Sequence, residues 1–214
     1  AGARCRGEAQ RAAGSGAMAA VGLSVKHFRE CYPDARVEVA AYNSDQNLTI
    51  AGSAADIADA LEAVRRLHSK ARVQKLDVAV AFHSLAMDVV LPGLRSSIDL
   101  CGLKVQQPEC PCLFFSSVTG CKATPALLAT GEHWAQSVRQ PVKFRDACVA
   151  CLTACQETQR IHCLEIGPKR QLQSYIESGA KTIALSEGSL SVHQSSTKEA
   201  GIGVTSEVCA DLWQ

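Results

Sequence analysis

Val80-Ala81-Phe82-His83-Ser84-Leu85-Ala86-Met87 is the stretch around which the rest of the chain is organised. It places one histidine at the end of an apolar, strand-like run and directly before an amphipathic segment. Strand-to-helix junctions in α/β proteins hold a side chain rigidly where it can still meet a ligand. Imidazole titrates near neutral pH, so His83 is a candidate general acid or base. The alternative is a histidine that packs in the core or caps a helix.

Upstream of this stretch, the sequence predicts strands at residues 17–21, 37–42, 48–51 and 73–80. Ser24 and Ser53 are expected to cap two helices. The apolar face of the second helix is marked by Ile57, Ala60, Leu61, Val64 and Leu67. The resulting order β-α-β-β-α-β over residues 16–80 is that of a ferredoxin-like, or split βαβ, unit.

Downstream, strands and helices alternate, which predicts a parallel α/β layer over residues 81–186. Expected strands are 113–118, 161–166 and 182–185, and Pro141 is expected to open a helix. From residue 187 the chain is rich in Ser and Gly without periodicity, which predicts a linker or disordered tail over 187–214. Residues 1–15 would be the end of a core segment that precedes the ferredoxin-like unit.

Length and charge narrow the classes of function. The 214 residues are 47% hydrophobic and carry a formal net charge of +1, without a basic stripe, which argues against a nucleic-acid partner. No apolar run approaches the ~20 residues of a membrane helix, so no membrane partner is expected. A cytoplasmic location is favoured, with an organellar one left open. Because the chain begins without Met, we expect it to be part of a longer polypeptide.

The cysteines favour packing over metal binding. There are eleven, and Cys148, Cys151 and Cys155 share one helical stripe with Phe144. Cysteine packs as a small hydrophobic residue, so a buried stripe is expected in a reducing compartment. Cys110-Pro111-Cys112 lacks the partners of a zinc site, and no metal is predicted. A cysteine–metal regulatory module remains an alternative.

Eight short motifs together resemble the acyltransferase domain of fatty-acid and polyketide synthases, the malonyl-CoA:acyl-carrier-protein transacylase family. They occur in the family's order between about residues 6 and 186. They are Gly16-Ala17-Met18-Ala19-Ala20-Val21, Ala41-Tyr42-Asn43, Ala51-Gly52, Ala81-Phe82-His83-Ser84, Ser117-Val118-Thr119-Gly120, Trp134, Pro141-Val142-Lys143-Phe144 and Glu165-Ile166-Gly167-Pro168.

The resemblance implies a fold and a chemistry. The fold would be α/β: part of an α/β-hydrolase-like acyltransferase core carrying an inserted ferredoxin-like subdomain. In the family, a serine on a Gly-His-Ser-x-Gly elbow attacks the malonyl thioester of coenzyme A, and a histidine takes its proton. The acyl group then passes to the phosphopantetheine thiol of an acyl carrier protein. No tightly bound cofactor is expected, since the coenzyme A thioester is a substrate.

The family's roles carry over to five positions. His83 would be the general base and acid, and the backbone carbonyl of Lys143 would accept its other ring N–H. Phe82 matches the aromatic of malonyl-specific members, which would exclude an α-methyl branch. Asn43 matches a family asparagine near the active site, with a turn residue as the equal alternative.

Arg6 would pair with the free malonyl carboxylate, a role that suits a planar guanidinium. Arg4 and Arg11 compete for this role, as does the interpretation that Arg6 is an ordinary surface arginine. Arg139, Lys143 and Arg145 form a basic cluster that an acidic carrier protein would fit, with a solvated helix start as the alternative.

One family element is missing. No Gly-x-Ser-x-Gly occurs in the 214 residues, and we expect the nucleophile elbow to lie upstream of Ala1. Residues that act as one unit lose function together, so this fragment is expected to be inactive alone although its parent is active. The alternative function is a non-catalytic acyltransferase remnant that serves as a structural or carrier-protein docking module.

Overall fold

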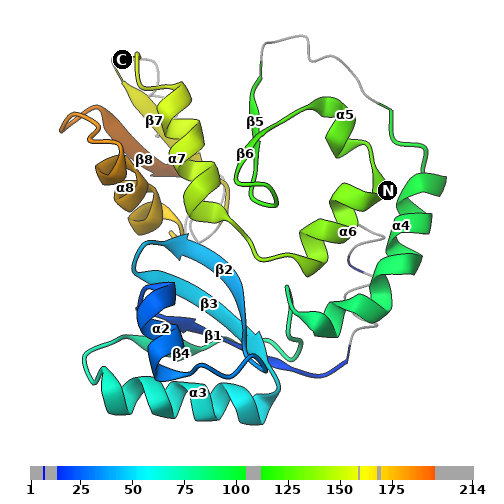
Figure 1. Ribbon diagram of the computed structural model, residues 1–214. Helices are drawn as coiled ribbons and strands as arrows, with labels where there is room; N and C mark the ends of the chain where they lie inside the picture. Colours follow the sequence, from blue (N-terminus) through cyan, green and yellow to red (C-terminus); the bar gives the residue numbers. More distant parts are fainter. Residues whose placement is uncertain (1–6, 8–13, 105–111, 159, 168–169, 196–214) are drawn as a thin grey trace. The chain divides into compact units, whose positions relative to one another are not determined.

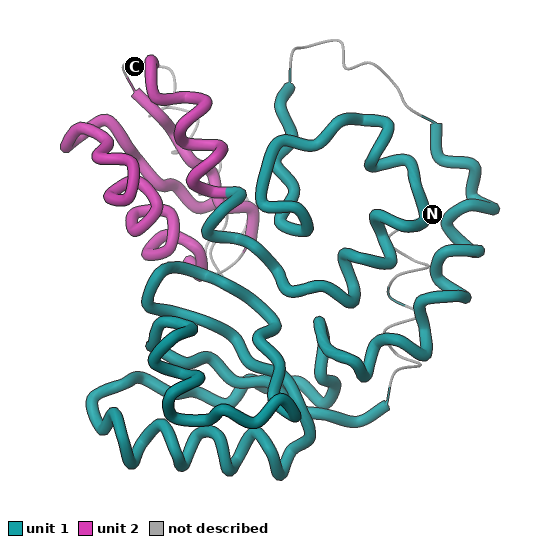
Figure 2. Tube along the Cα trace, viewed as in Figure 1, with its two compact units in different colours: residues 1–147 teal, residues 148–214 magenta. Residues whose placement is uncertain are grey.

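The computed structural model describes residues 7, 14–104, 112–158, 160–167 and 170–195. The chain forms two compact units, residues 1–147 and 148–214 (Figure 2). Helices and strands occur in both, as expected for an α/β protein. In the part of the chain that the structure describes, no helix is long and apolar enough to cross a membrane.

An antiparallel four-stranded sheet forms the first part of unit 1 (Figure 1). Its elements follow in the order β1-α2-β2-β3-α3-β4, and the strands lie in the order β2-β3-β1-β4. Their bounds are β1 Ala17–Val21, α2 Val25–Cys31, β2 Glu38–Ser44, β3 Asn47–Gly52, α3 Ala54–Leu67 and β4 Val73–Lys75. The sequence of helices and strands is therefore the predicted β-α-β-β-α-β.

The last strand is shorter than predicted. β4 ends at Lys75, whereas the apolar pattern suggested a strand to Val80. Pairing with the β1 segment continues irregularly, because Leu76 N–H donates to the Met18 carbonyl at 2.9 Å and Gly16 N–H donates to the Ala79 carbonyl at 2.8 Å. The chain thus stays beside β1 up to Ala81 without forming a regular ladder.

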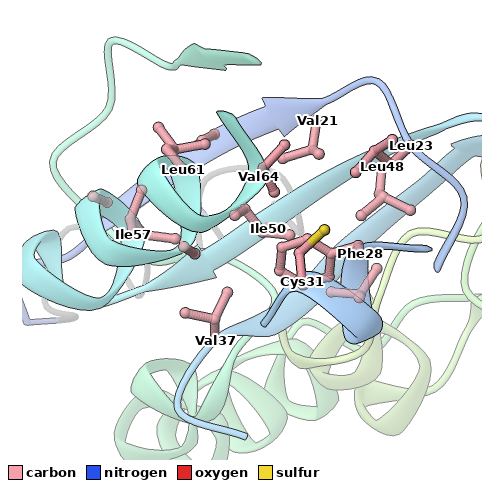
Figure 3. Packing of buried hydrophobic residues seen from close by; sticks show 14 residues of the cluster. Val21, Leu23, Phe28, Cys31, Val37, Leu48, Ile50, Ile57, Leu61 and Val64 are labelled. Atoms are coloured by element: carbon pink, nitrogen blue, oxygen red, sulfur yellow. The ribbon is translucent and has the colours of Figure 1, made fainter. Parts of the chain in front are cut away.

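The two helices begin where their capping residues predict. The Ser24 hydroxyl accepts from His27 N–H, and the Ser53 hydroxyl accepts from Asp56 N–H. Ile57, Ala60, Leu61 and Val64 face the sheet and are buried with Phe28, Leu48 and Ile50 (Figure 3). Leu67 was expected on the same face, but it is 55% exposed because it is the last residue of α3.

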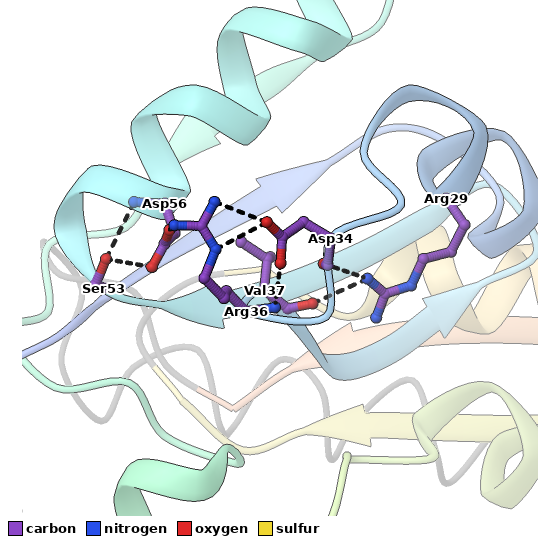
Figure 4. Close-up of polar contacts among 6 residues, drawn as sticks. All are labelled: Arg29, Asp34, Arg36, Val37, Ser53 and Asp56. Carbon is purple, nitrogen blue, oxygen red and sulfur yellow. Dashed lines mark hydrogen bonds and ion pairs between the residues drawn. The ribbon is translucent and has the colours of Figure 1, made fainter.

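Polar contacts fix the approach to β2. Arg36 binds the Asp34 carboxylate at 2.7 Å and the Asp56 carboxylate at 2.8 Å, and so joins the loop to the start of α3 (Figure 4). Arg29 donates to the carbonyls of Asp34 and Val37. These contacts set the direction in which the chain enters β2.

Helices dominate the rest of unit 1. A 3₁₀ helix, η1 Leu85–Val90, runs directly into helix α4, Leu91–Leu100, which has Pro92 in its first turn. Met87, Val90, Leu94, Ile98 and Val138 form a second buried cluster. The elements are η1 Leu85–Val90, α4 Leu91–Leu100, the hairpin β5 Phe114–Ser116 and β6 Cys121–Ala123, α5 Pro125–Leu128, α6 Gly131–Arg139 and α7 Phe144–Ala154, which continues into unit 2.

Unit 2 contains a parallel strand pair, β7 Ile161–Glu165 and β8 Leu190–Gln194, with α8 Gln173–Thr182 between them in sequence. Two predictions are wrong here. The expected strand at 182–185 is the end of α8 and the following turn, and β8 lies within the segment expected to be a tail. Pairing with β7 turns residues 190–194 into a strand, and this non-local contact leaves no mark in the local sequence pattern.

The cysteine stripe of α7 is partly buried. Cys148 and Cys155 pack with Cys163 against Leu152 and other apolar residues of unit 2, whereas Cys151 is exposed. Burial is the main reason that the pKa of Cys148 is raised to about 11, with Cys163 and Cys151 adding to it. The packing interpretation therefore holds for Cys148 and Cys155 but not for Cys151.

The burial of His133 predicts that the stability of this fold depends on pH. Its side chain is buried in α6, and Nδ1 has no hydrogen-bond partner among the described residues. Burial lowers the pKa of the imidazole below its ordinary value of 6.5, so the unfolded chain binds a proton more readily than the folded chain. The neutral side chain's contribution to stability is therefore present above pH 6.5.

We predict that the free energy of unfolding falls as the pH drops below 6.5 and through the pKa of folded His133. His133→Leu should flatten this decrease, because a neutral side chain of similar size has no proton to bind. Urea unfolding at several pH values between 7 and 5 measures the slope. Equal slopes for the two proteins would contradict the prediction.

Candidate active site

Ser84 closes the turn that carries the candidate histidine. Its buried hydroxyl donates to the Ala81 carbonyl at 2.7 Å and accepts from Ala86 N–H at 3.3 Å, which caps η1. The side chain of Ser84 therefore joins the segment before His83 to the helix after it. This serine therefore has a structural role in the turn.

His83 has a left-handed backbone conformation with a φ of 57°. For a residue with a Cβ atom this conformation costs about 1–2 kcal/mol, although histidine adopts it more often than most residues. Its N–H donates to the Val138 carbonyl at 3.2 Å, which ties the turn to α6. Strained residues persist where their surroundings fix them, and they concentrate at functional sites.

The imidazole is oriented by a backbone carbonyl. His83 Nδ1 lies 2.9 Å from the carbonyl oxygen of Gln140. A carbonyl only accepts hydrogen bonds, so Nδ1 carries a proton and, in the neutral ring, the lone pair is on Nε2. Nε2 is therefore the nitrogen that would accept a proton from a nucleophile.

This contact corrects the prediction that Lys143 supplies the orienting carbonyl. The Lys143 carbonyl accepts from Ala147 N–H at 3.1 Å and so belongs to the hydrogen-bond ladder of α7. Gln140 caps α6 in an extended conformation, as expected for a residue before proline. Its carbonyl is thereby turned out of the helix. The position of Gln140 directly before Pro141 is the feature of the sequence that could have identified its carbonyl as the acceptor.

Three of the family motifs meet at this point. Val142 pairs with β2 through hydrogen bonds of 2.8 Å to the Ala40 carbonyl and from Tyr42 N–H, and Lys143 N–H donates to the Ser117 carbonyl at 2.6 Å. The next turn contains Gly120 with a φ of 79°, where a Cβ would lie 2.9 Å from that of Asp146. The segment after α6 is thus held between β2 and the Ser117–Gly120 turn.

Phe82 is half-buried and packs against two apolar clusters, the one around Met87 and Val90 and the one around Met18 and Ala40. It is adjacent to His83 in sequence. Its packing explains how the turn is anchored, and a role in acyl selection stays a prediction.

Asn43 lies in β2 and donates from its amide to Thr49 Oγ1 at 3.1 Å and to Asn47 Oδ1 at 3.5 Å. These contacts stay within the β2–β3 hairpin, and Asn43 itself lies in the strand and not in the turn that was its alternative. A role in substrate binding stays a prediction.

Arg4, Arg6 and Arg11 lie outside the described residues, as does Cys110-Pro111 of the weak zinc motif. Of the expected basic cluster, Arg145 is paired with Asp45 and Asp146, and Arg139 with Glu38 and Asp88. Within the described ranges, no group of three or more His, Cys, Asp or Glu side chains is placed to hold a metal ion.

A cavity of about 360 Å³ in unit 1 adjoins the segment that follows Gln140. Ser24, Tyr42 and Lys143 are among its lining residues, and His83 is not. The cavity is therefore separate from the imidazole.

Comparison with known proteins identifies the class to which this arrangement belongs. Residues 2–201 match the family model described as "Acyl transferase domain". A hybrid PKS-NRPS synthetase of Aspergillus violaceofuscus is 35% identical over 163 residues, which cover 74% of this chain and 4% of that protein. The cyclo-acetoacetyl-L-tryptophan synthase of Aspergillus oryzae is 30% identical over 221 residues, covering 98% of this chain and 5% of that protein.

Solved structures show the same fold. The acyltransferase domain from the second module of the salinomycin polyketide synthase matches with a TM-score of 0.78 and 22% identity, over 98% of this chain and 46% of that one. A malonyl CoA-acyl carrier protein transacylase from Clostridium perfringens matches with a TM-score of 0.74 and 19% identity, over 99% of this chain and 63% of that one.

The chain belongs to the acyltransferase-domain family. Its curated relatives in this comparison are polyketide-synthase proteins or similar large synthases, and it spans only a few per cent of their length. The resemblance stated from the eight motifs is thereby confirmed.

The close approach of Gly16 to Ala81 generates a prediction for this site. A Cβ at Gly16 would lie 2.6 Å from both the Cβ and the N of Ala81. Gly16→Ala should therefore move the segment that leads to His83 and destabilise the chain by about 1–3 kcal/mol. Gly93→Ala is the matched control, because no atom lies within 4 Å of its added Cβ. The control should be neutral or stabilising by up to about 1 kcal/mol.

Chemical denaturation measures both free energies of unfolding, and the NMR signals of the His83 ring report its displacement. A Gly16→Ala variant as stable as the Gly93→Ala variant would contradict the proposed packing of the turn.

Proposed function

We propose that the protein containing this chain transfers a malonyl group from coenzyme A to an acyl carrier protein in polyketide or fatty-acid synthesis. The proposal rests on the geometry of His83, which has a left-handed backbone conformation and donates a hydrogen bond from Nδ1–H to the Gln140 carbonyl. With the proton on Nδ1, Nε2 is the basic nitrogen of the neutral ring, which supports a role for it in proton transfer. Membership of the acyltransferase family supports the reaction class.

The proposed reaction has two half-reactions. Nε2 of His83 takes the proton of a serine hydroxyl while the serine oxygen attacks the thioester carbonyl. Collapse of the tetrahedral intermediate breaks the carbon–sulfur bond, and the imidazolium returns the proton to the sulfur of coenzyme A. In the second half-reaction, the carrier-protein thiol gives its proton to His83 and attacks the serine ester. The serine then recovers its proton as the leaving group.

The serine must come from outside these 214 residues, because they contain no Gly-x-Ser-x-Gly. Oxyanion-hole amides would come from the same elbow. We therefore propose that the isolated chain does not turn over substrate and that the longer protein does. A substituted elbow serine in the longer protein would favour the alternative, a non-catalytic docking module.

The finer features of the fold follow the same proposal. Residues 16–80 have the strand order β4-β1-β3-β2 when read from the other edge, which supports a ferredoxin-like insertion. The parallel pair β7–β8 with its flanking helices supports an origin in an α/β-hydrolase-like core. We place the reaction in the cytoplasm, where malonyl-CoA and a carrier protein would be its partners.

Substrate selection is assigned to three residues. Phe82 would exclude an α-methyl branch, Arg6 would bind the free malonyl carboxylate, and Asn43 would lie near the acyl group. The structural support for a role in substrate selection differs among these residues. Phe82 directly precedes His83, whereas the amide of Asn43 already bonds to Thr49.

The catalytic role of His83 predicts the behaviour of the full-length protein. Labelled malonyl-CoA should give an acyl-serine adduct, and His83→Gln should slow its formation by about 10²–10⁴-fold, the usual contribution of general acid–base catalysis. Rapid-quench measurement of protein-bound label follows the adduct. His133→Gln is the matched control, because that histidine lies in α6 outside the proposed chemistry, and at pH 8 it should leave the rate nearly unchanged. An adduct that forms equally fast in His83→Gln would refute the mechanism.

Phe82 predicts a change in substrate choice. Phe82→Ser should raise the use of methylmalonyl-CoA relative to malonyl-CoA by about 10–200-fold, since discrimination by packing is worth about 1–3 kcal/mol. Both thioesters are supplied in one competition assay, so that any loss of folded protein cancels in the product ratio. An unchanged ratio would leave Phe82 with its packing role alone.

A further inference from the structure

Three segments of unit 1 meet around the turn of His83 through charged side chains. Glu38 is the first residue of β2, Arg139 is the last residue of α6, and Asp88 lies in η1. None of the three belongs to the motifs that identify the family. Together they link the strand, the helix and the turn.

Glu38 uses both of its carboxylate oxygens. Oε1 accepts a hydrogen bond of 2.6 Å from the N–H of Leu85, which lies two residues after His83. Oε2 lies 3.2 Å from Nη1 of Arg139. A hydrogen bond to a charged acceptor is roughly twice as strong as one between neutral groups. Glu38 therefore holds the backbone two residues after the left-handed residue.

Arg139 extends this link to the end of α6. Its Nε donates to Asp88 at 2.6 Å, while its Nη1 binds Glu38. The next residue is Gln140, whose carbonyl accepts from the His83 ring. Through its ion pairs, Arg139 thus ties its neighbour Gln140, whose carbonyl is the acceptor, to the turn of His83, whose ring N–H is the donor.

Burial indicates which contact matters more. The side chains of Arg139 and Glu38 are only 18% and 28% exposed, whereas Asp88 is 51% exposed. Exposed ion pairs contribute little because water screens them, and partly buried pairs are screened less. Of the two ion pairs of Arg139, the pair with Glu38 is therefore expected to contribute more to holding the turn.

We propose that Glu38 and Arg139 are positioning residues for the acyl-transfer reaction, which hold the left-handed turn of His83 against the Gln140 carbonyl and so fix the protonation site of the ring. This inference rests on the proposed function for its kinetic consequence. Its structural consequence, the tautomer of His83, does not depend on that function.

The first readout is the tautomer of neutral His83, measured by ¹⁵N NMR of the imidazole in the 214-residue chain. The wild type should be predominantly Nδ1–H. Glu38→Ala removes the acceptor of Leu85 N–H and the partner of Arg139, and it should raise the Nε2–H fraction. Glu38→Gln keeps an oxygen acceptor for Leu85 but loses the charge, so its change should be smaller. Arg139→Lys should also raise the Nε2–H fraction, because one ammonium group cannot reproduce the fork between Asp88 and Glu38.

The second readout is kinetic and uses the full-length protein. Glu38→Ala and Arg139→Lys should lower kcat by roughly 10–100-fold, the scale of a small misplacement of a catalytic group, with little change in KM for the thioester. Arg95→Gln is the matched control, because it breaks an exposed Arg–Glu pair between α4 and α6, at 2.7 Å, that does not contact the turn. It should alter neither the tautomer nor kcat.

The outcomes separate the two proposals. A wild-type tautomer in Glu38→Ala and Arg139→Lys overturns the positioning role, whatever the activity. If Glu38→Ala does not fold, the tautomers of Glu38→Gln and Arg139→Lys decide the question. A shifted tautomer in a full-length protein without acyl transfer would support the positioning role and refute the proposed function.

Discussion

The hydrogen bond from His83 Nδ1–H to the Gln140 carbonyl is the interaction on which the candidate site depends. It requires a carbonyl that has left the helical ladder at a defined place. Pro141 supplies that condition, since the residue before a proline is driven from helical to extended backbone. The same segment then pairs with β2 at Ala40 and Tyr42, so the acceptor is fixed on both sides.

The donor side of this bond is equally constrained. A left-handed histidine costs about 1–2 kcal/mol relative to a relaxed one. The contacts that offset this cost come from backbone and side-chain polar groups: Ser84 with Ala81, His83 N–H with Val138, and Leu85 N–H with Glu38. The first closes the turn itself, and the other two join the turn to α6 and to β2. Several independent contacts of this kind can hold a strained residue in place.

Local patterns in the sequence predicted the parts of this fold that local forces decide. The caps at Ser24 and Ser53, the strand β1 and the buried face of α3 follow from propensity and periodicity. Elements that depend on distant partners were missed. β8 exists because it pairs with β7, and β4 ends at Lys75 although the apolar pattern continues.

The difference between local and distant determinants also explains which parts of the candidate site could be predicted from the sequence. His83 stood out because its side-chain chemistry is visible in the sequence, whereas its acceptor is a backbone group that every residue carries. The orienting carbonyl was therefore assigned to Lys143 within the Pro-Val-Lys-Phe motif, three residues from its true place at Gln140. Any residue type at position 140 could supply this backbone carbonyl. The direction of the carbonyl is therefore set by the neighbouring residues. Pro141 fixes that direction through its ring, and in our proposal Arg139 does so through its charge.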